Sequence, residues 1–244
     1  MPGVSLLFAA GSRPTVADLQ RLADTTGHFS ISLDPSAGNT EGQGWLELLI
    51  TGLTFDLKGL LPSEGARIPK FEHAYGVPPS VDRNAAEAVE LVPGPHLAGG
   101  ATMFPVVRSL ALLAARLSGL DGVSGVVWHA AGACSAPDIF QRGVVAWVEG
   151  GPFPGLGLTS LETDANGGLR SRGLALLTGQ ELALSADMCA DRARAAKIAL
   201  RLINWVVEHG RIDAQLAFSG PGGEALVLEA VENSTIVRVV QGSR

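Results

Sequence analysis

The stretch from Trp128 to Asp138 holds the residue types that come closest to a catalytic set in this chain. His129, Cys134 and Asp138 follow a predicted strand and could act as base, thiolate and orienting carboxylate, because a cysteine nucleophile needs an imidazole to lower its pKa. The alternative is a histidine at a strand end, a small buried thiol and an aspartate in a proline turn, and we favour that alternative. With one further carboxylate, the candidate pocket consists of Trp128, His129, Cys134, Asp138 and Glu162.

Basic residues concentrate on two predicted elements. Arg170 and Arg172 lie on one strand of a hairpin, whereas Arg194, Lys197 and Arg201 share one face of the last helix. If the hairpin approached the helix, these five residues could hold a phosphate or an acidic segment of a partner. The alternative is a solvated face, which is the commoner role of such rows.

Cofactor and metal motifs are incomplete throughout the sequence. Gly155-Leu156-Gly157 begins a dinucleotide pattern but lacks the third glycine and leads into a strand instead of a helix. Gly220-Pro221-Gly222-Gly223 is not followed by the Lys-Ser or Lys-Thr of a phosphate-binding loop. The histidines and the two cysteines have no zinc-ligand spacing. We therefore expect no cofactor and no metal.

Composition narrows the class of protein. The 244 residues are 46% hydrophobic and 17% charged, against about 25% charged in ordinary soluble domains, a composition that disfavours disorder and predicts a weakly charged surface. A formal charge of −6 opposes nucleic acid as a ligand. The N-terminus has no secretory layout, and the longest apolar run, 103–117, is too short for a membrane span. We expect a cytoplasmic protein, with a protein partner or a homo-oligomer favoured by the low charge.

The first half is expected to contain short strands and one helix. Strands are predicted over 4–10, 29–33 and, in two pieces, 45–57, with a helix from Thr15 to Gly27. Six prolines between 58 and 100 interrupt the pattern, and only 85–92 could form a short element of uncertain type, which indicates a linker or loop. The expected division is therefore 1–60 as an N-terminal half, 61–100 as an irregular linker and 101–244 as a C-terminal half, unless all three form one compact domain.

The second half is expected to alternate helices with hairpins. Helices are predicted over 102–117 and 188–209, the latter capped by Asp187, and strands over 123–129, 143–148, 181–186, 215–219, 225–229 and 236–240. Asn166-Gly167 predicts a two-residue turn that joins 158–165 to 168–177, so that Thr163 faces Arg170. The pattern favours an α+β fold: mainly antiparallel sheets with helices packed on one face, in two similar halves.

Several segments of this second half carry a resemblance to a known family. They are Pro95-His96-Leu97 and the apolar helix after it, Val126-Val127-Trp128, 136–140, and above all 163–182, which ends in Gly179-Gln180-Glu181-Leu182. Over roughly residues 90–210, the chain resembles the bacterial domain of unknown function 4261 family. The resemblance implies a bacterial protein with an α+β fold, and it implies no activity.

Three functional hypotheses follow. The leading one is a non-enzymatic module that binds a protein or a small ligand, with Trp45, Trp147 and Phe153 near glycine-rich loops as anchors, although core placement of these rings is equally compatible. The alternative is a small hydrolase or transferase with a pocket between the halves, near His129 and Cys134. The third is a structural homo-oligomer.

Overall fold

A computed structural model describes residues 2–36, 44–62, 68–78, 86–231, 233 and 235–242. The chain divides into two compact units, Met1–Gly151 and Pro152–Arg244, which are called unit 1 and unit 2 below. Among the described helices, none has the length and hydropathy that crossing a bilayer requires.

Unit 1 is built on one sheet that contains eight described strands. Their order is β2-β3-β4-β6-β1-β7-β8-β5, and neighbours are antiparallel except for the β5–β8 pair. The strands are β1 (Val4–Phe8), β2 (Ser30–Leu33), β3 (Trp45–Ile50), β4 (Leu53–Lys58), β5 (His73–Tyr75), β6 (Glu87–Pro93), β7 (Val123–Trp128) and β8 (Ala133–Ser135).

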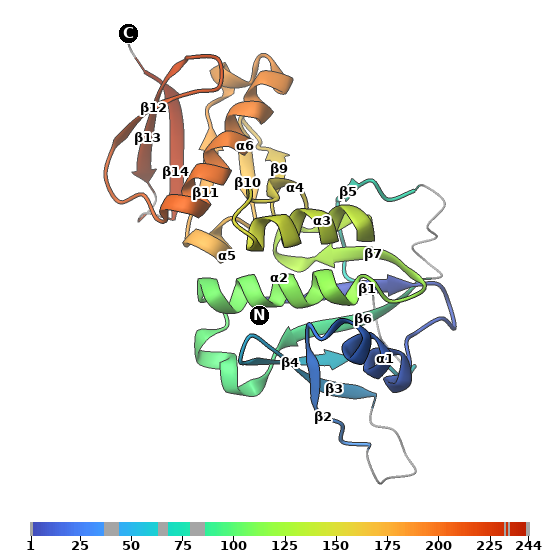
Figure 1. Cartoon of the computed structure of the whole chain (residues 1–244). Coiled ribbons are helices and arrows are strands. Elements are labelled where there is room, and N and C mark those ends of the chain that lie inside the picture. Colours follow the sequence, from blue (N-terminus) through green and yellow to red (C-terminus); the bar gives the residue numbers. More distant parts are fainter. Residues whose placement is uncertain are drawn as a thin grey trace. The chain divides into compact units, whose positions relative to one another are not determined.

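Three α-helices cover one face of this sheet (Figure 1). They are α1 (Val16–Thr26), α2 (Phe104–Leu117) and α3 (Pro137–Val148); the short 3-10 turns η1 (Pro95–Gly100) and η2 (His129–Ala131) complete the unit. On β3 the burial follows the period of two that such coverage demands: Leu46 and Leu48 are fully buried, whereas Leu49 is 37% exposed. The central strand β1 is buried at every position. The α+β fold with helices on one face is thereby confirmed.

Local signals position α1 and α2 as the sequence predicts. Thr15 caps α1 and forms a reciprocal capping box with Asp18, and Gly27 ends the helix in the left-handed region with a φ of 64°. In α2, Pro105 lies in the first turn, where its missing N–H costs nothing.

Two predictions for unit 1 are wrong. Residues 61–100 are not a linker between halves, because β6 within them pairs with both β4 and β1, and its Val89 and Leu91 are fully buried. The predicted strand 143–148 is the second half of α3. In that helix Phe140, Val144 and Trp147 recur at helical spacing on the buried side.

Unit 2 has a second sheet, in the order β12-β13-β14-β11-β10-β9, with β11 and β14 parallel and the other neighbours antiparallel. Its strands are β9 (Ser160–Thr163), β10 (Leu169–Arg172), β11 (Glu181–Leu184), β12 (Leu216–Ser219), β13 (Ala225–Val231) and β14 (Ile236–Gln241). Its helical segments are α4 (Gly155–Leu158), α5 (Ala175–Thr178), η3 (Ala186–Cys189) and α6 (Arg192–His209).

The long helix α6 packs on this sheet through a buried stripe that includes Ala195, Ile198 and Leu202. Asp191 caps the helix by accepting a hydrogen bond from the backbone N–H of Arg194. The predicted cap, Asp187, lies instead within η3, because a 3-10 turn separates the strand from the helix.

The hairpin at Asn166-Gly167 is present, but its predicted register is wrong. Thr163 pairs with Leu169, and Arg170 pairs with Glu162. The Asp164 side chain accepts hydrogen bonds from the backbone N–H groups of Asn166 and Gly168, at 2.8 and 2.9 Å, and so organises a loop longer than two residues.

Candidate functional site

The structure brings His129 together with two residues that the sequence did not single out. The imidazole Nε2 lies 2.8 Å from the hydroxyl of Ser5, and Nδ1 lies 3.8 Å from a carboxylate oxygen of Glu90. Ser5 and Glu90 face each other on β1 and β6, and His129 follows β7, on the other side of β1. The three side chains therefore have the atom order of a Ser-His-Glu triad.

Burial decides what this arrangement can do. Ser5 is 2% exposed, and it lies within a strand that pairs on both sides, so its backbone cannot supply an oxyanion hole. Burial lowers the pKa of His129, while the Glu90 carboxylate opposes that change. The hydroxyl thus orients a neutral imidazole, and the geometry describes a positioned histidine better than an activated nucleophile.

The titration of His129 gives a direct check. We expect its pKa, measured by NMR of the imidazole protons, to lie below the ordinary 6.5, and Glu90→Gln to lower it further because a stabilising charge is lost. Since the folded protein holds this proton less tightly than the unfolded chain does, its contribution to stability is complete above pH 6.5 and falls as the pH drops below that value. Glu47→Gln is the control. An unchanged or raised pKa of His129 in Glu90→Gln would contradict the interaction between the two residues.

Cys134 and Trp128 belong to the core. Cys134 is fully buried on β8, where it packs with Leu7 and Val127. A side chain added at Gly125 would lie only 2.8 Å from its Sγ, which places the thiol over Gly125. His129 lies four residues further along the chain, a distance of roughly 13 Å in an extended strand, so the two groups do not converge.

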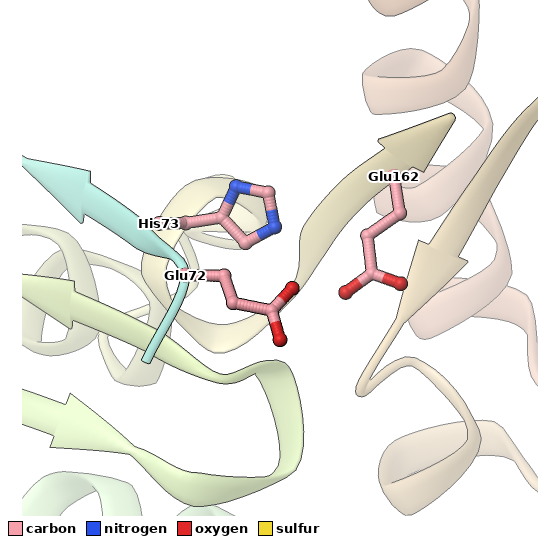
Figure 2. A group of neighbouring side chains, drawn as sticks. All are labelled: Glu72, His73 and Glu162. Carbon is pink, nitrogen blue, oxygen red and sulfur yellow. The ribbon is translucent and has the colours of Figure 1, made fainter. Parts of the chain in front are cut away.

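The two carboxylates predicted for the pocket each have an ion-pair partner. Asp138 is in the first turn of α3 and forms an exposed ion pair with Arg142 at 3.1 Å. Glu162 is on β9 of unit 2, paired with Arg172 at 3.0 Å. Figure 2 labels Glu162, which belongs to unit 2, and also Glu72 and His73, which belong to unit 1; His73 is the first residue of β5.

The five basic residues do not form one anion site, because they lie on different sides of the sheet of unit 2. Buried Leu169 and Ser171 face the α6 side of β10, so the alternation of the strand directs Arg170 and Arg172 to the opposite side. On α6, Arg194 pairs with Glu224 at 2.9 Å, and the Arg201 guanidinium lies 5.9 Å from the centre of the Phe218 ring. Lys197 is exposed.

The Gly179-Gln180-Glu181 stretch has a structural role. The Gln180 amide bonds both backbone groups of Ile212 at 2.8 Å. The Glu181 carboxylate accepts hydrogen bonds from the Ser171 hydroxyl and from the three backbone N–H groups of 173–175. Burial raises the pKa of Glu181, and these hydrogen bonds partly offset the rise.

A pocket of about 250 Å³ lies in unit 1 between α1 and the turn after α2. One wall consists of the segment from Ser12 to Pro14 and of four residues of α1, which are Asp18, Arg21, Leu22 and Thr25. The segment from Gly119 to Asp121 forms the other wall. This pocket is called the Arg13 pocket below. No sequence motif marks it, because its walls are about 100 residues apart in the chain.

The Arg13 side chain lines this pocket and is largely buried, with 10% of it exposed. Its Nε donates to Glu87 at 2.9 Å, and its Nη1 donates to the carbonyl oxygens of Gly59 and Ala88. Among the described residues, Arg13 Nη2 has no hydrogen-bond partner. This atom is also accessible to solvent. One fixed pair of N–H donors is therefore left for a ligand.

Comparison of the chain with protein-family models, curated proteins and solved structures finds no match. The resemblance to the domain of unknown function 4261 family therefore stays a prediction.

Proposed function

We propose that unit 1 is a non-enzymatic binding module whose ligand is a small polar molecule held in the Arg13 pocket. The single observation that carries this proposal is the largely buried Arg13 guanidinium, which lines the pocket, is held by three protein contacts and keeps one amino group without a partner among the described residues. Such preorganisation lowers the entropy lost on binding. A volume of about 250 Å³ lies below the ~300–1,000 Å³ of typical pockets for drug-sized ligands, which favours a small metabolite.

The aromatic anchors give less support to a protein-binding groove. Trp147 and Phe153 are each 8% exposed, and Trp147 packs edge-on against Phe104 with ring centres 5.9 Å apart. Trp45 remains half-buried on β3. Core packing therefore accounts for two of the three rings. A pocket for a small ligand is better supported than a groove for a protein partner.

A cytoplasmic location and a further protein contact are also proposals. Cys134 and Cys189 are both unpaired thiols, which is usual in a reducing compartment. On the helix-free side of the first sheet, Leu33 and Leu49 are 47% and 37% exposed, and they would suit a contact with a second copy or another protein. Light scattering of the purified chain tests the homo-oligomer.

The ligand pocket is tested by filling it. We expect Thr25→Trp to abolish binding of any small molecule that stabilises the wild-type protein, because Thr25 lines the pocket and a bulky ring there would occupy it. A thermal-shift panel of amino acids, carboxylates, amines and phosphate at millimolar concentration provides the ligands.

Thr26→Trp is the matched control for this substitution. Thr26 is the exposed next residue of α1 and does not line the pocket, so its variant should bind normally. Equal loss in both variants, or panel stabilisation that survives Thr25→Trp, would place the ligand elsewhere.

The Ser5, His129 and Glu90 arrangement supports a second candidate function, hydrolysis by a serine nucleophile. We rank it second because Ser5 is 2% exposed. The account predicts no labelling of Ser5 by a fluorophosphonate probe in the folded protein at pH 8. Labelling that Ser5→Ala and His129→Ala both remove would establish the second function in place of the first.

A further inference from the structure

We infer that the ligand of the Arg13 pocket is a small zwitterion of the α-amino acid class, with its carboxylate at Arg13 and its ammonium group at Asp121. This inference rests on the proposed binding function and deepens it. It follows from how the charged groups are distributed over the two walls of the pocket.

The wall formed by the start of α1 presents donors for a carboxylate. Arg13 Nη2 offers N–H groups from a position fixed by three protein contacts, and Arg21 adds a second guanidinium, 70% exposed. A guanidinium is suited to carboxylate recognition because its N–H groups match the two oxygens. The Asp18 carboxylate on this wall is already engaged, because it accepts from the backbone N–H and hydroxyl of Thr15 and from Arg21.

The opposite wall presents negative charge. Asp121 lies just beyond the C-terminal end of the 14-residue helix α2, where the helix dipole adds partial negative charge. Among the described residues, the Asp121 carboxylate has no hydrogen-bond or ion-pair partner. It is therefore free to receive an ammonium group.

The balance of charge selects a zwitterion over a simple anion or cation. Arg13 is paired with Glu87, and Arg21 with Asp18, so the donor wall is close to neutral although it is rich in N–H donors. A lone carboxylate would gain these hydrogen bonds but would also face Asp121, and a lone amine would leave Arg13 Nη2 unpaired. A zwitterion satisfies both walls, and its own charges cancel.

Three matched probes separate these cases. L-alanine carries both groups, propionate lacks the ammonium group, and ethylamine lacks the carboxylate. In NMR titrations of the full chain, we expect L-alanine to shift the backbone amides of Ser12, Arg21 and Leu120 and to bind at least tenfold more tightly than either other probe. Asp121→Asn should weaken L-alanine about tenfold and leave propionate unchanged or slightly improved.

Each outcome decides the inference. Propionate binding as tightly as L-alanine at the same amides would overturn the zwitterion and leave the binding pocket intact. L-alanine binding that is insensitive to Asp121→Asn would also overturn it. If none of the three probes shifts these amides, the inference is wrong. The thermal-shift panel with Thr25→Trp then decides separately whether the pocket binds a ligand at all.

Discussion

Glu181→Ala is expected to destabilise unit 2 by about 3 kcal/mol. The substitution removes the acceptor for three backbone N–H groups of residues 173–175 and for the Ser171 hydroxyl, and a buried donor left without a partner costs about 1–3 kcal/mol. Urea unfolding of the full chain, followed by the fluorescence of Trp205 in a variant that keeps this tryptophan alone, measures the loss in unit 2.

The control for this prediction is Glu162→Ala. Its ion pair with Arg172 is partly exposed, with side chains 37% and 40% accessible, so its removal should cost less than about 1 kcal/mol. Burial raises the pKa of Glu181 above the ordinary glutamate value of 4.5, so ionisation of this residue destabilises unit 2 as the pH rises above 4.5. This part of the pH dependence of stability should vanish in Glu181→Ala. Equal costs for the two alanine variants would contradict the role given to Glu181.

Leu48→Ala is expected to cost 2–5 kcal/mol in unit 1, whereas Leu49→Ala should cost less than about 1 kcal/mol. The two leucines are neighbours on β3 and point to opposite sides of the sheet; Leu48 is fully buried on the helix side and Leu49 is 37% exposed. Truncating a buried leucine removes its transfer free energy and leaves a cavity. Urea unfolding of the two variants compares the faces directly.

The comparison tests the architecture of unit 1 with a matched pair of substitutions. Similar losses for both leucines would mean that β3 is also packed on its helix-free side, and the one-sided packing of this strand would then be wrong. The same outcome would remove the argument that Leu33 and Leu49 are free to contact a partner.

Local signals predicted the parts of the fold that local chemistry determines. The capping box of Thr15 and Asp18, the left-handed Gly27 and Pro105 in the first turn of α2 depend on residues within a few positions, and each appears as predicted. The errors came where distant pairing overrides the local pattern. The sequence predicts at most a short element of uncertain type over 85–92, yet residues 87–93 form a central strand because β4 and β1 pair with them on both sides.

The candidate site was less accessible to sequence reasoning. His129 was singled out, but its contact with Ser5 joins residues 124 positions apart, and no spacing rule predicts that pairing. The predicted hairpin register was wrong for a local reason. The Asp164 side chain accepts hydrogen bonds from the backbone N–H groups of Asn166 and Gly168, and it thereby stabilises a longer loop. Arg13 follows a strand without a motif, and only the fold places it opposite the segment that follows α2.

A crystal structure of the full chain grown with 10 mM L-alanine tests the central claim most directly. The account predicts density for the amino acid in the Arg13 pocket, with its carboxylate within hydrogen-bond distance of Arg13 Nη2 and its ammonium group at Asp121. An Arg13 pocket that holds only water, while the amino acid binds elsewhere on the chain, would contradict it.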